Sequence, residues 1–257
     1  MVQEAVDSVL AQTCSDFELI VVDDGSEDGT AESLARYGSA MRIYSQPRRG
    51  VAAARNRGAE RAAGLYLAFL DSDDLWLPRK LEVQMTFMRE RPWVQICQTE
   101  EIWIRRGGRV NPRKKHRKLS GDIFRASLEL CLVSPSAVMM KRELFDAVGG
   151  FDETLPACED YDLWLRVARS HMVPLISDPL VIKRGGHPDQ LSRSIWGLDR
   201  FRVAALQKLL GSGLEREKRD WALEVLRRKA AILSLGARKR GNQEMARRYD
   251  AVVSELN

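Results

Sequence analysis

The sequence predicts an α/β protein with a mostly parallel central sheet, flanking helices and a C-terminal helical appendage. Short apolar runs rich in β-branched residues alternate with helical segments along the first two thirds of the chain. This alternation is typical of strand–helix–strand units, whose crossovers are right-handed almost without exception. From about residue 189 the composition changes to helix formers with many arginines and lysines. We therefore expect an α/β domain at 1–188 and a helical region at 189–257.

The N-terminal part of the chain shows the two periodicities most clearly. Val2, Val6 and Val9 share one face of a first helix, whereas the run FELIVV at 17–22 has the β-branched character of a buried strand. Pro78 is favourable in the first turn of a later helix. The expected helices are 2–11, 30–37, 51–63 and 78–89, and the expected strands are 17–22, 42–45 and 65–70.

The rest of the chain adds further strands and helices around a basic segment at 105–118. Gly107, Gly108 and Pro112 interrupt this segment, so we expect an exposed loop. A solvated run of charges without a binding role explains it equally well. The expected strands are 94–97, 101–104 and 137–140, with an extended segment at 174–183, and the expected helices are 122–130, 141–148, 158–170, 189–210, 215–235 and 241–255.

Composition limits the class of protein. The 257 residues are 44% hydrophobic and 30% charged, which is enough to bury a substantial core in one large domain and an appendage. A net charge of +5 is compatible with nucleic acid, a membrane surface or an anionic substrate. Four cysteines without CxxC spacing and without a signal peptide predict reduced thiols in a cytoplasmic protein. No run reaches transmembrane length, so we expect any membrane role to be peripheral.

A cluster of carboxylates follows the strand expected at 65–70. Asp71, Asp73 and Asp74 come directly after this apolar run, and ligands of α/β sheets bind at the carboxyl ends of strands. Acidic side chains that repel one another at a strand tip are best explained by a hard divalent cation, Mg²⁺ or Mn²⁺. The plain alternative is a polar loop that caps the next helix.

A second acidic group opens the helix expected at 158–170. Glu159, Asp160 and Asp162 occupy its first turn. Such residues complement the positive end of the helix dipole, and by themselves they need no other explanation.

Four segments then stand in a particular order: VVDDGSEDGT at 21–30, GVAAARNRG at 50–58, LAFLDSDD at 67–74 and GGFDETLPACEDYDLWLR at 149–166. Together they closely resemble the inverting glycosyltransferases of family 2, over about residues 2–194. The resemblance implies the GT-A fold, which binds a nucleotide sugar through an Asp-x-Asp metal motif. Four ordered motifs are a far more specific signal than one short motif.

The resemblance and the chemistry ask for the same residue types. A divalent ion held by Asp71 and Asp73 would stabilise the charge of the leaving diphosphate. Asp71 would also contact the nucleotide, through the ion or the ribose hydroxyls. Inversion needs a base that removes the proton of the acceptor hydroxyl, and Asp160 matches the aspartate of the family's Glu-Asp motif.

Four more residues are candidates for donor binding. Asp23, and more weakly Asp24, match positions that contact the base of the nucleotide in the family, although an Asx-turn also explains an aspartate there. Arg55 resembles the nucleotide-facing arginine of the family, with a solvated helix position as its alternative. His187, in the segment GGHP, corresponds to a further metal or diphosphate ligand, although a lone histidine is more often structural or exposed.

The chain departs from the family pattern at its start. Relatives begin with a strand that lies centrally in the sheet, whereas Met1 falls within the helix that follows it. We therefore expect a gap in the sheet with an unpaired edge. This departure keeps open a second hypothesis, a relative that binds nucleotide sugars or glycans without catalysis.

The expected partners follow from the resemblance. They are a UDP-, GDP- or dTDP-sugar donor and a glycan or lipid-linked acceptor, as in the synthesis of cell-surface polysaccharides or glycoconjugates. We expect a cytoplasmic protein with a peripheral contact at the inner face of the membrane. Nucleic-acid binding rests only on the net charge and the basic loop, and we expect no nucleic-acid partner.

Overall fold

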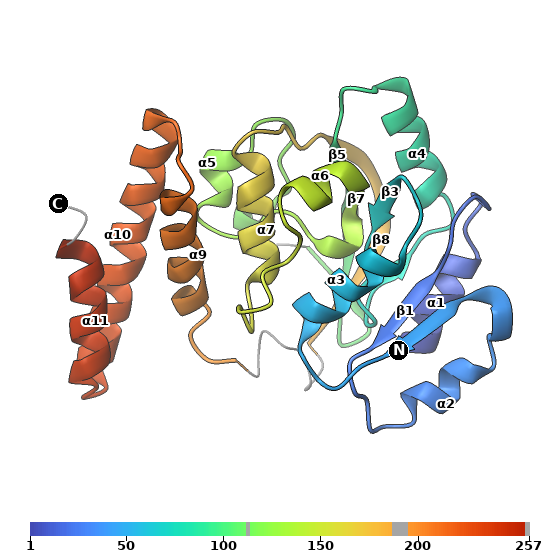
Figure 1. Cartoon of the computed structure of the whole chain (residues 1–257), viewed down its shortest axis with the longest axis horizontal. Coiled ribbons are helices and arrows are strands. Elements are labelled where there is room, and N and C mark those ends of the chain that lie inside the picture. The colour runs from blue at the N-terminus through green and yellow to red at the C-terminus, as the bar shows by residue number, and fades with distance from the viewer. Residues whose placement is uncertain (112–113, 187–194, 255–257) are drawn as a thin grey trace.

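The structure is a computed structural model that describes residues 1–111, 114–186 and 195–254. It is a mixed α/β protein with a curled central sheet, helices on both sides of it, and three C-terminal helices at one end (Figure 1). The expected fold class is confirmed.

The strands are β1 (Ile20–Asp23), β2 (Arg42–Ser45), β3 (Tyr66–Ala68), β4 (Leu75–Trp76), β5 (Ile96–Arg105), β6 (Gly108–Val110), β7 (Val138–Lys141) and β8 (Leu175–Gly185). The α-helices are α1 (Val2–Leu10), α2 (Thr30–Ala35), α3 (Val51–Arg61), α4 (Lys80–Glu90), α5 (Phe124–Ser127), α6 (Arg142–Ala147), α7 (Glu159–Ala168), α9 (Asp199–Gly211), α10 (Arg216–Lys239) and α11 (Gln243–Ser254). Short 3₁₀ turns are η1 (Gly38–Ala40), η2 (Lys114–His116) and η3 (Pro135–Ala137).

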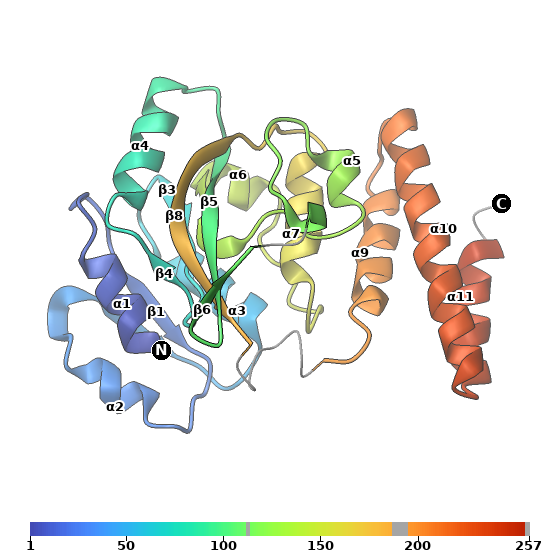
Figure 2. The ribbon, with the colours of Figure 1, turned by 180° about the vertical axis from the view of Figure 1, so that it is seen from behind.

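The strands form two sheets. β1 and β2 pair in parallel, and a six-stranded sheet has the order β3–β7–β5–β8–β4, with β6 paired to β5. The long strands β5 and β8 run side by side through the middle of the molecule (Figure 2). This arrangement brings the carboxyl end of β8 next to the loop that follows β3.

The expectation of a mostly parallel sheet needs correction. Among the described strands, β1–β2 and β5–β8 are parallel, whereas β3–β7, β5–β7, β4–β8 and β5–β6 are antiparallel. The turn at Arg106 and Gly107 is too short for a crossover, so β6 must fold back against β5. The alternation of elements predicts the α/β class, but strand direction depends on the length and path of each connection.

The two strands expected at 94–97 and 101–104 form one strand, β5. The polar residues between them stay in the ladder because the register shifts around Glu100 as a bulge. Lys118 Nζ donates to Gln98 Oε1 at 3.1 Å, which satisfies a polar side chain within this buried stretch. The sequence predicted two strands because such pairing comes from a distant segment.

The sheet is interrupted between β1 and β3. Within the described part of the chain, β1 pairs only with β2, and β3 pairs only with β7. Val21 of β1 and Leu67 of β3 both line a cleft of about 1,600 Å³ that continues to the ends of these strands. The gap expected in the sheet is therefore present, and it forms part of the cleft.

The three C-terminal helices pack against the α/β part through a shared core. One buried cluster contains Leu163 of α7, Leu206 of α9 and Leu226 of α10. Lys208 of α9 also donates to Asp152 Oδ2 at 2.7 Å, across the same boundary. The expected domain boundary near residue 188 lies outside the described residues and stays a prediction. In the described ranges, no helix combines the length and the apolar character needed to cross a bilayer.

Candidate active site

The cleft collects the predicted site residues from four parts of the fold. Its lining includes every such residue that the structure describes, namely Asp23, Asp24, Arg55, Asp71, Asp73 and Asp160. They come from the end of β1, from α3, from the loop after β3 and from the first turn of α7. His187 lies outside the described residues. The cleft thus joins segments that are far apart in the sequence.

Arg55 connects the two acidic groups. Its Nη2 donates to Asp71 Oδ1 at 2.6 Å and its Nη1 donates to Glu159 Oε1 at 2.7 Å. The guanidinium lies 5.1 Å from the ring centre of Phe151, which supports it from one side. A nearly buried arginine with two carboxylate partners is a fixed bridge, so the solvated alternative for Arg55 does not hold.

The two carboxylates bound to Arg55 have pKa values that are shifted in opposite directions. Burial raises the pKa of Asp71, but the charges of Arg55 and Lys183 outweigh it and hold that pKa below its ordinary value. Burial and the neighbouring charge of Asp160 raise the pKa of Glu159, against the effect of Arg55. Asp71 is therefore held as a carboxylate at the tip of the strand.

Asp74 is enclosed by donors from other elements. Its side chain is 1% exposed. It accepts hydrogen bonds from Ser136 Oγ at 2.7 Å, from Lys183 Nζ at 3.3 Å and from the Arg184 backbone N–H at 2.9 Å. Burial raises the pKa of Asp74 to about 6. These partners give Asp74 a structural role in holding the loop against β8 and the η3 turn.

The acidic loop fits a hard divalent cation. One carboxylate oxygen from each of Asp71, Asp73 and Asp74 lies within 4.8 Å of the others. Oxygen donors at this spacing suit Mg²⁺ or Mn²⁺. The oxygens of Asp74 already accept several hydrogen bonds. Metal binding by Asp71 and Asp73 stays a prediction.

The first turn of α7 presents Asp160 to the same cleft. Asp160 Oδ2 accepts a hydrogen bond from Cys131 Sγ at 3.4 Å, and Oδ1 accepts one from the Tyr161 backbone N–H at 2.7 Å. Burial and the charge of Asp160 raise the pKa of Cys131 well above its ordinary value, so this thiol remains protonated and donates. Asp162, in contrast, is buried against Arg166 and Lys208.

Asp23 and Asp24 shape the loop that follows β1 and line the cleft. Asp23 is buried, and its Oδ1 accepts from the Ser26 backbone N–H, three residues on, at 3.0 Å. Asp24 accepts from the backbone N–H groups of Arg49 and Gly50, at 2.8 and 2.7 Å, just before α3 begins. Both thus have a structural task, and their contact with a nucleotide stays a prediction.

Sequence reasoning missed the basic end of β8. Lys183 reaches Asp74, and Arg184 Nε donates to the backbone carbonyl of Asp73. Burial lowers the pKa of Lys183, but the carboxylates of Asp74, Asp71 and Glu101 outweigh it and raise that pKa above its ordinary value. The sequence did contain an indication of this: Lys183 and Arg184 follow the apolar residues of β8, just as the acidic loop follows β3.

The fold defines the class of the protein. Over 99% of this chain and 88% of the other, it matches the crystal structure of S. aureus TarS 1–349 in complex with UDP-GlcNAc, with a TM-score of 0.68 and 15% identity. It also matches the mannosyltransferase PcManGT from Pyrobaculum calidifontis in complex with GDP-Man and Mn²⁺, over 99% and 79% of the two chains, with a TM-score of 0.61 and 20% identity. The chain therefore has the GT-A fold.

The family follows from the sequence. The family model described as glycosyl transferase family 2 matches residues 1–149, more than half of the chain, and the chain belongs to this family.

Several curated relatives share this sequence similarity. An uncharacterized glycosyltransferase of Rickettsia felis is 34% identical over 66% of this chain and 28% of its own length. The Escherichia coli β-1,3-glucosyltransferase WfgD is 29% identical over 68% of each chain. The putative teichuronic acid biosynthesis glycosyltransferase TuaG of Bacillus subtilis is 46% identical over 35% of this chain and 37% of its own. The chain thus spans little more than a quarter of the Rickettsia felis relative.

Proposed function

We propose that this protein transfers a sugar from a nucleotide-diphosphate donor to an acceptor hydroxyl, with inversion at the anomeric carbon. The observation that supports it best is the cleft in which the acidic loop after β3 faces Asp160 of α7, with Arg55 bridging Asp71 and Glu159 between them. Donor activation and acceptor activation need such groups on opposite sides of one sugar.

The donor half of the site is the acidic loop. Asp73 and Asp71 would hold Mn²⁺ or Mg²⁺, which when bound neutralises the charge of the nucleotide diphosphate as it leaves. Arg55 keeps the Asp71 carboxylate in place and ionised. Lys183 and Arg184 of β8 hold this loop in place, because Lys183 donates to the Asp74 carboxylate and Arg184 donates to the Asp73 backbone carbonyl. Asp23 and Asp24 also line the cleft, and we place the base of the nucleotide beside them.

The acceptor half of the site is Asp160. Its carboxylate takes the proton of the acceptor hydroxyl as the oxygen attacks the anomeric carbon from the face opposite the diphosphate. The new carbon–oxygen bond forms while the bond to the diphosphate oxygen breaks, and the nucleoside diphosphate leaves with the electron pair. The configuration of the anomeric carbon is inverted as a result.

The relatives suggest the kind of substrate. The name of WfgD gives UDP-Glc as its donor and α-D-GlcNAc-diphosphoundecaprenol as its acceptor, and that of TuaG refers to teichuronic acid biosynthesis. The titles of the two solved structures name UDP-GlcNAc, GDP-Man and Mn²⁺. We accordingly propose a UDP-, GDP- or dTDP-sugar donor and a glycan or lipid-linked acceptor, in the synthesis of a cell-surface polysaccharide or glycoconjugate. A peripheral contact with the inner membrane face would bring the protein to such an acceptor.

Calorimetric titration of UDP, GDP and dTDP, each with and without MnCl₂, tests donor binding on the unmodified chain. We expect one nucleotide to bind only with the metal. Donor sugars of that nucleotide are then incubated with the protein, and the released nucleoside diphosphate is measured. Release supports the enzyme, binding without release supports a non-catalytic relative, and no metal-dependent binding overturns both.

A further inference from the structure

The acidic loop after β3 is a four-residue turn whose two ends are held by one buried serine. The turn spans residues 71–74, and the Asp74 backbone N–H donates to the Asp71 carbonyl at 3.0 Å. Ser136 Oγ accepts from the Asp71 backbone N–H at 3.2 Å and donates to Asp74 Oδ2 at 2.7 Å. A hydroxyl has one proton to donate and lone pairs to accept, so Ser136 bonds to both ends of the turn at once.

Ser136 acts from behind the cleft. It is 0% exposed and does not line the cleft, whereas Asp71 and Asp73 do. It belongs to the η3 turn, about sixty residues further along the chain than the acidic loop. Ser136 can therefore affect a ligand in the cleft only through the position of the acidic loop.

The η3 turn is itself held by three buried side chains of β4 and α4. Trp76 Nε1 donates to the carbonyl of Ser136 at 2.8 Å. Gln84 Nε2 and Lys80 Nζ donate to the carbonyls of the next two residues, at 3.1 and 3.4 Å. Three consecutive carbonyls of one short segment thus each accept from a side chain of the segment 76–84. This pattern fixes the backbone that carries the Ser136 hydroxyl.

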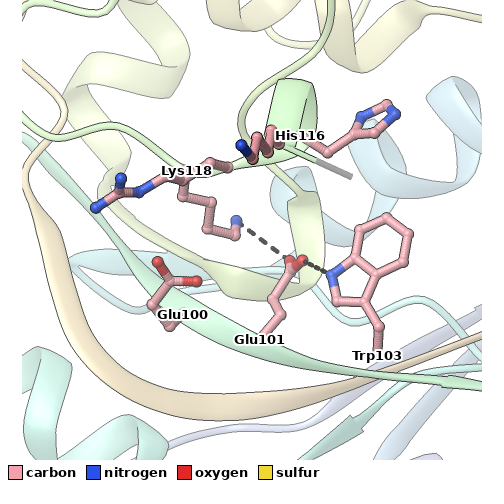
Figure 3. Close-up of a pocket in the computed structure, with 7 residues that line it drawn as sticks. Glu100, Glu101, Trp103, His116 and Lys118 are labelled. Atoms are coloured by element: carbon pink, nitrogen blue, oxygen red, sulfur yellow. Dashed lines mark hydrogen bonds and ion pairs between the residues drawn. The ribbon is translucent and has the colours of Figure 1, made fainter. Parts of the chain in front are cut away.

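Lys80 differs from the other buried lysines of the described chain. Lys118 pairs with Glu101 at 3.2 Å (Figure 3), and Lys229 pairs with Asp199 at 3.2 Å. Lys80 has no carboxylate partner among the described residues, and its ammonium lies 3.9 Å from the centre of an indole ring. Burial lowers the pKa of Lys80 to about 7. Its burial is therefore costly, and its polar contacts are made to the segment that positions the acidic loop.

We propose that Ser136 is a positioning residue for the divalent cation of the acidic loop, and that Trp76, Lys80 and Gln84 keep it in place. The carboxylate oxygens of this loop lie within 4.8 Å of one another and repel when no cation is present. A turn fixed at both ends keeps them together before the cation arrives, so less ordering is needed on binding. The inference rests on the metal role that the proposed function gives to this loop.

The test measures Mn²⁺ binding directly, without turnover. MnCl₂ is titrated into the full chain with and without UDP, GDP or dTDP, and free Mn²⁺ is quantified by its EPR signal. Mn²⁺ bound by nucleotide alone is subtracted. Ser136→Ala removes the hydroxyl that holds both ends of the turn, so the Mn²⁺ affinity should fall at least about tenfold.

Ser234→Ala is the matched control. Ser234 is 2% exposed, and its Oγ donates to Asp250 Oδ1 at 2.6 Å, between α10 and α11. Each variant removes a buried hydroxyl from an aspartate, so both should lower the melting temperature. Only Ser136→Ala should weaken Mn²⁺ binding, which separates positioning of the loop from a general loss of stability.

Trp76→Phe tests whether the support of η3 acts through Ser136. It keeps an aromatic ring beside Lys80 but removes the N–H that donates to the Ser136 carbonyl. The Mn²⁺ affinity should fall, by less than in Ser136→Ala. In the double variant the second change should add little, because both changes act on the same turn. Trp76→Phe also carries the test if Ser136→Ala does not fold.

Several results would overturn the inference. Equal Mn²⁺ affinity of Ser136→Ala and the unmodified chain removes the role of Ser136, and equal weakening by Ser234→Ala assigns the effect to stability. Additive losses in the double variant remove the link from Trp76 to Ser136. If the unmodified chain binds no Mn²⁺, the metal role in the proposed function fails too, whereas unchanged binding in Ser136→Ala removes only this inference.

Discussion

The loop after β3 and the first turn of α7 present similar acidic patterns and use them differently. Each contributes three carboxylates within four residues, and the fold divides each set in the same way. One carboxylate in each set is bound to Arg55, one is buried against cations, and the third, like the first, lines the cleft. These pairs are Asp71 and Glu159, Asp74 and Asp162, and Asp73 and Asp160.

The two sets differ in what surrounds them. The strand-end set (Asp71, Asp73 and Asp74) is held in place by β8, because Lys183 Nζ and the Arg184 backbone N–H both donate to Asp74. The helix set (Glu159, Asp160 and Asp162) is held partly by its own helix, since Asp162 pairs with Arg166 four residues later, and partly by Lys208 of α9, which also pairs with Asp162. The first set brings three carboxylates to within 4.8 Å of one another, which suits a cation. The second turns one carboxylate toward the cleft beside Cys131, which suits a base.

The largest expected effect tests the metal role of the strand-end set. Asp73→Asn should remove the metal-dependent part of nucleotide binding, because it replaces a charged oxygen donor with a neutral one. Calorimetry with UDP, GDP or dTDP and MnCl₂ measures it. Asp74→Asn is the matched control: it should retain metal dependence and lose about 1–3 kcal/mol of unfolding free energy, because Lys183 loses its buried partner. Metal dependence that survives Asp73→Asn would move the ion to Asp71 and Asp74.

A second prediction tests the base in the helix set. Asp160→Asn keeps the size of the side chain but removes the proton acceptor, so turnover should fall by about 10² to 10⁴. Donor affinity should remain, because the base engages the acceptor hydroxyl only in the transition state. The change at the start of the helix should cost less than about 1 kcal/mol. Turnover, donor affinity and melting temperature are measured on one sample.

Two outcomes would change the assignment of Asp160. Near-normal turnover would move the base to Glu159 or Asp162. Lost donor binding would instead make Asp160 part of the donor site.

The smallest expected effect concerns Asp162, the buried carboxylate of the helix set, and its ion pair with Lys208 of α9. Lys208 donates to both Asp162 and Asp152. Partial burial raises the pKa of Asp152, but hydrogen bonds from Lys208 and Thr154 outweigh it and lower that pKa to about 2. Because the folded-state pKa is depressed, the stabilisation is present above about pH 4 and is lost as the pH falls toward 2.

Lys208→Met should therefore cost less than about 1 kcal/mol at neutral pH, since Lys208 is partly exposed and solvent screens the pair. The difference from the unmodified chain should shrink as the pH falls from 4 toward 2. Urea unfolding at several pH values measures it, and NMR titration of Asp152 should show its pKa rising toward the ordinary value. A pH-independent difference would assign the effect to packing.

The strands that lead into the site and the family were predictable because the sequence patterns that indicate them are local. The β-branched run at 17–22 and the apolar run at 65–70 carry the strand period, and each ends in acidic residues at the point where the structure opens its cleft. The order of four short motifs indicated the family, which the match over residues 1–149 shows. The roles of Asp73 and Asp160 stay predictions, and the structure places both residues in the lining of one cleft.

The tertiary structure decided what depends on distant partners. Whether Asp74 or Asp73 faces the cleft depends on Lys183 and Ser136, which lie more than sixty residues away along the chain. β5 is one strand because Lys118 satisfies Gln98 within it, and the sheet is mixed because short turns reverse strand direction. Sequence periodicity indicates which face of a helix or strand is buried. It does not indicate which charged side chains form pairs, because the partners come from distant segments that only the fold brings together.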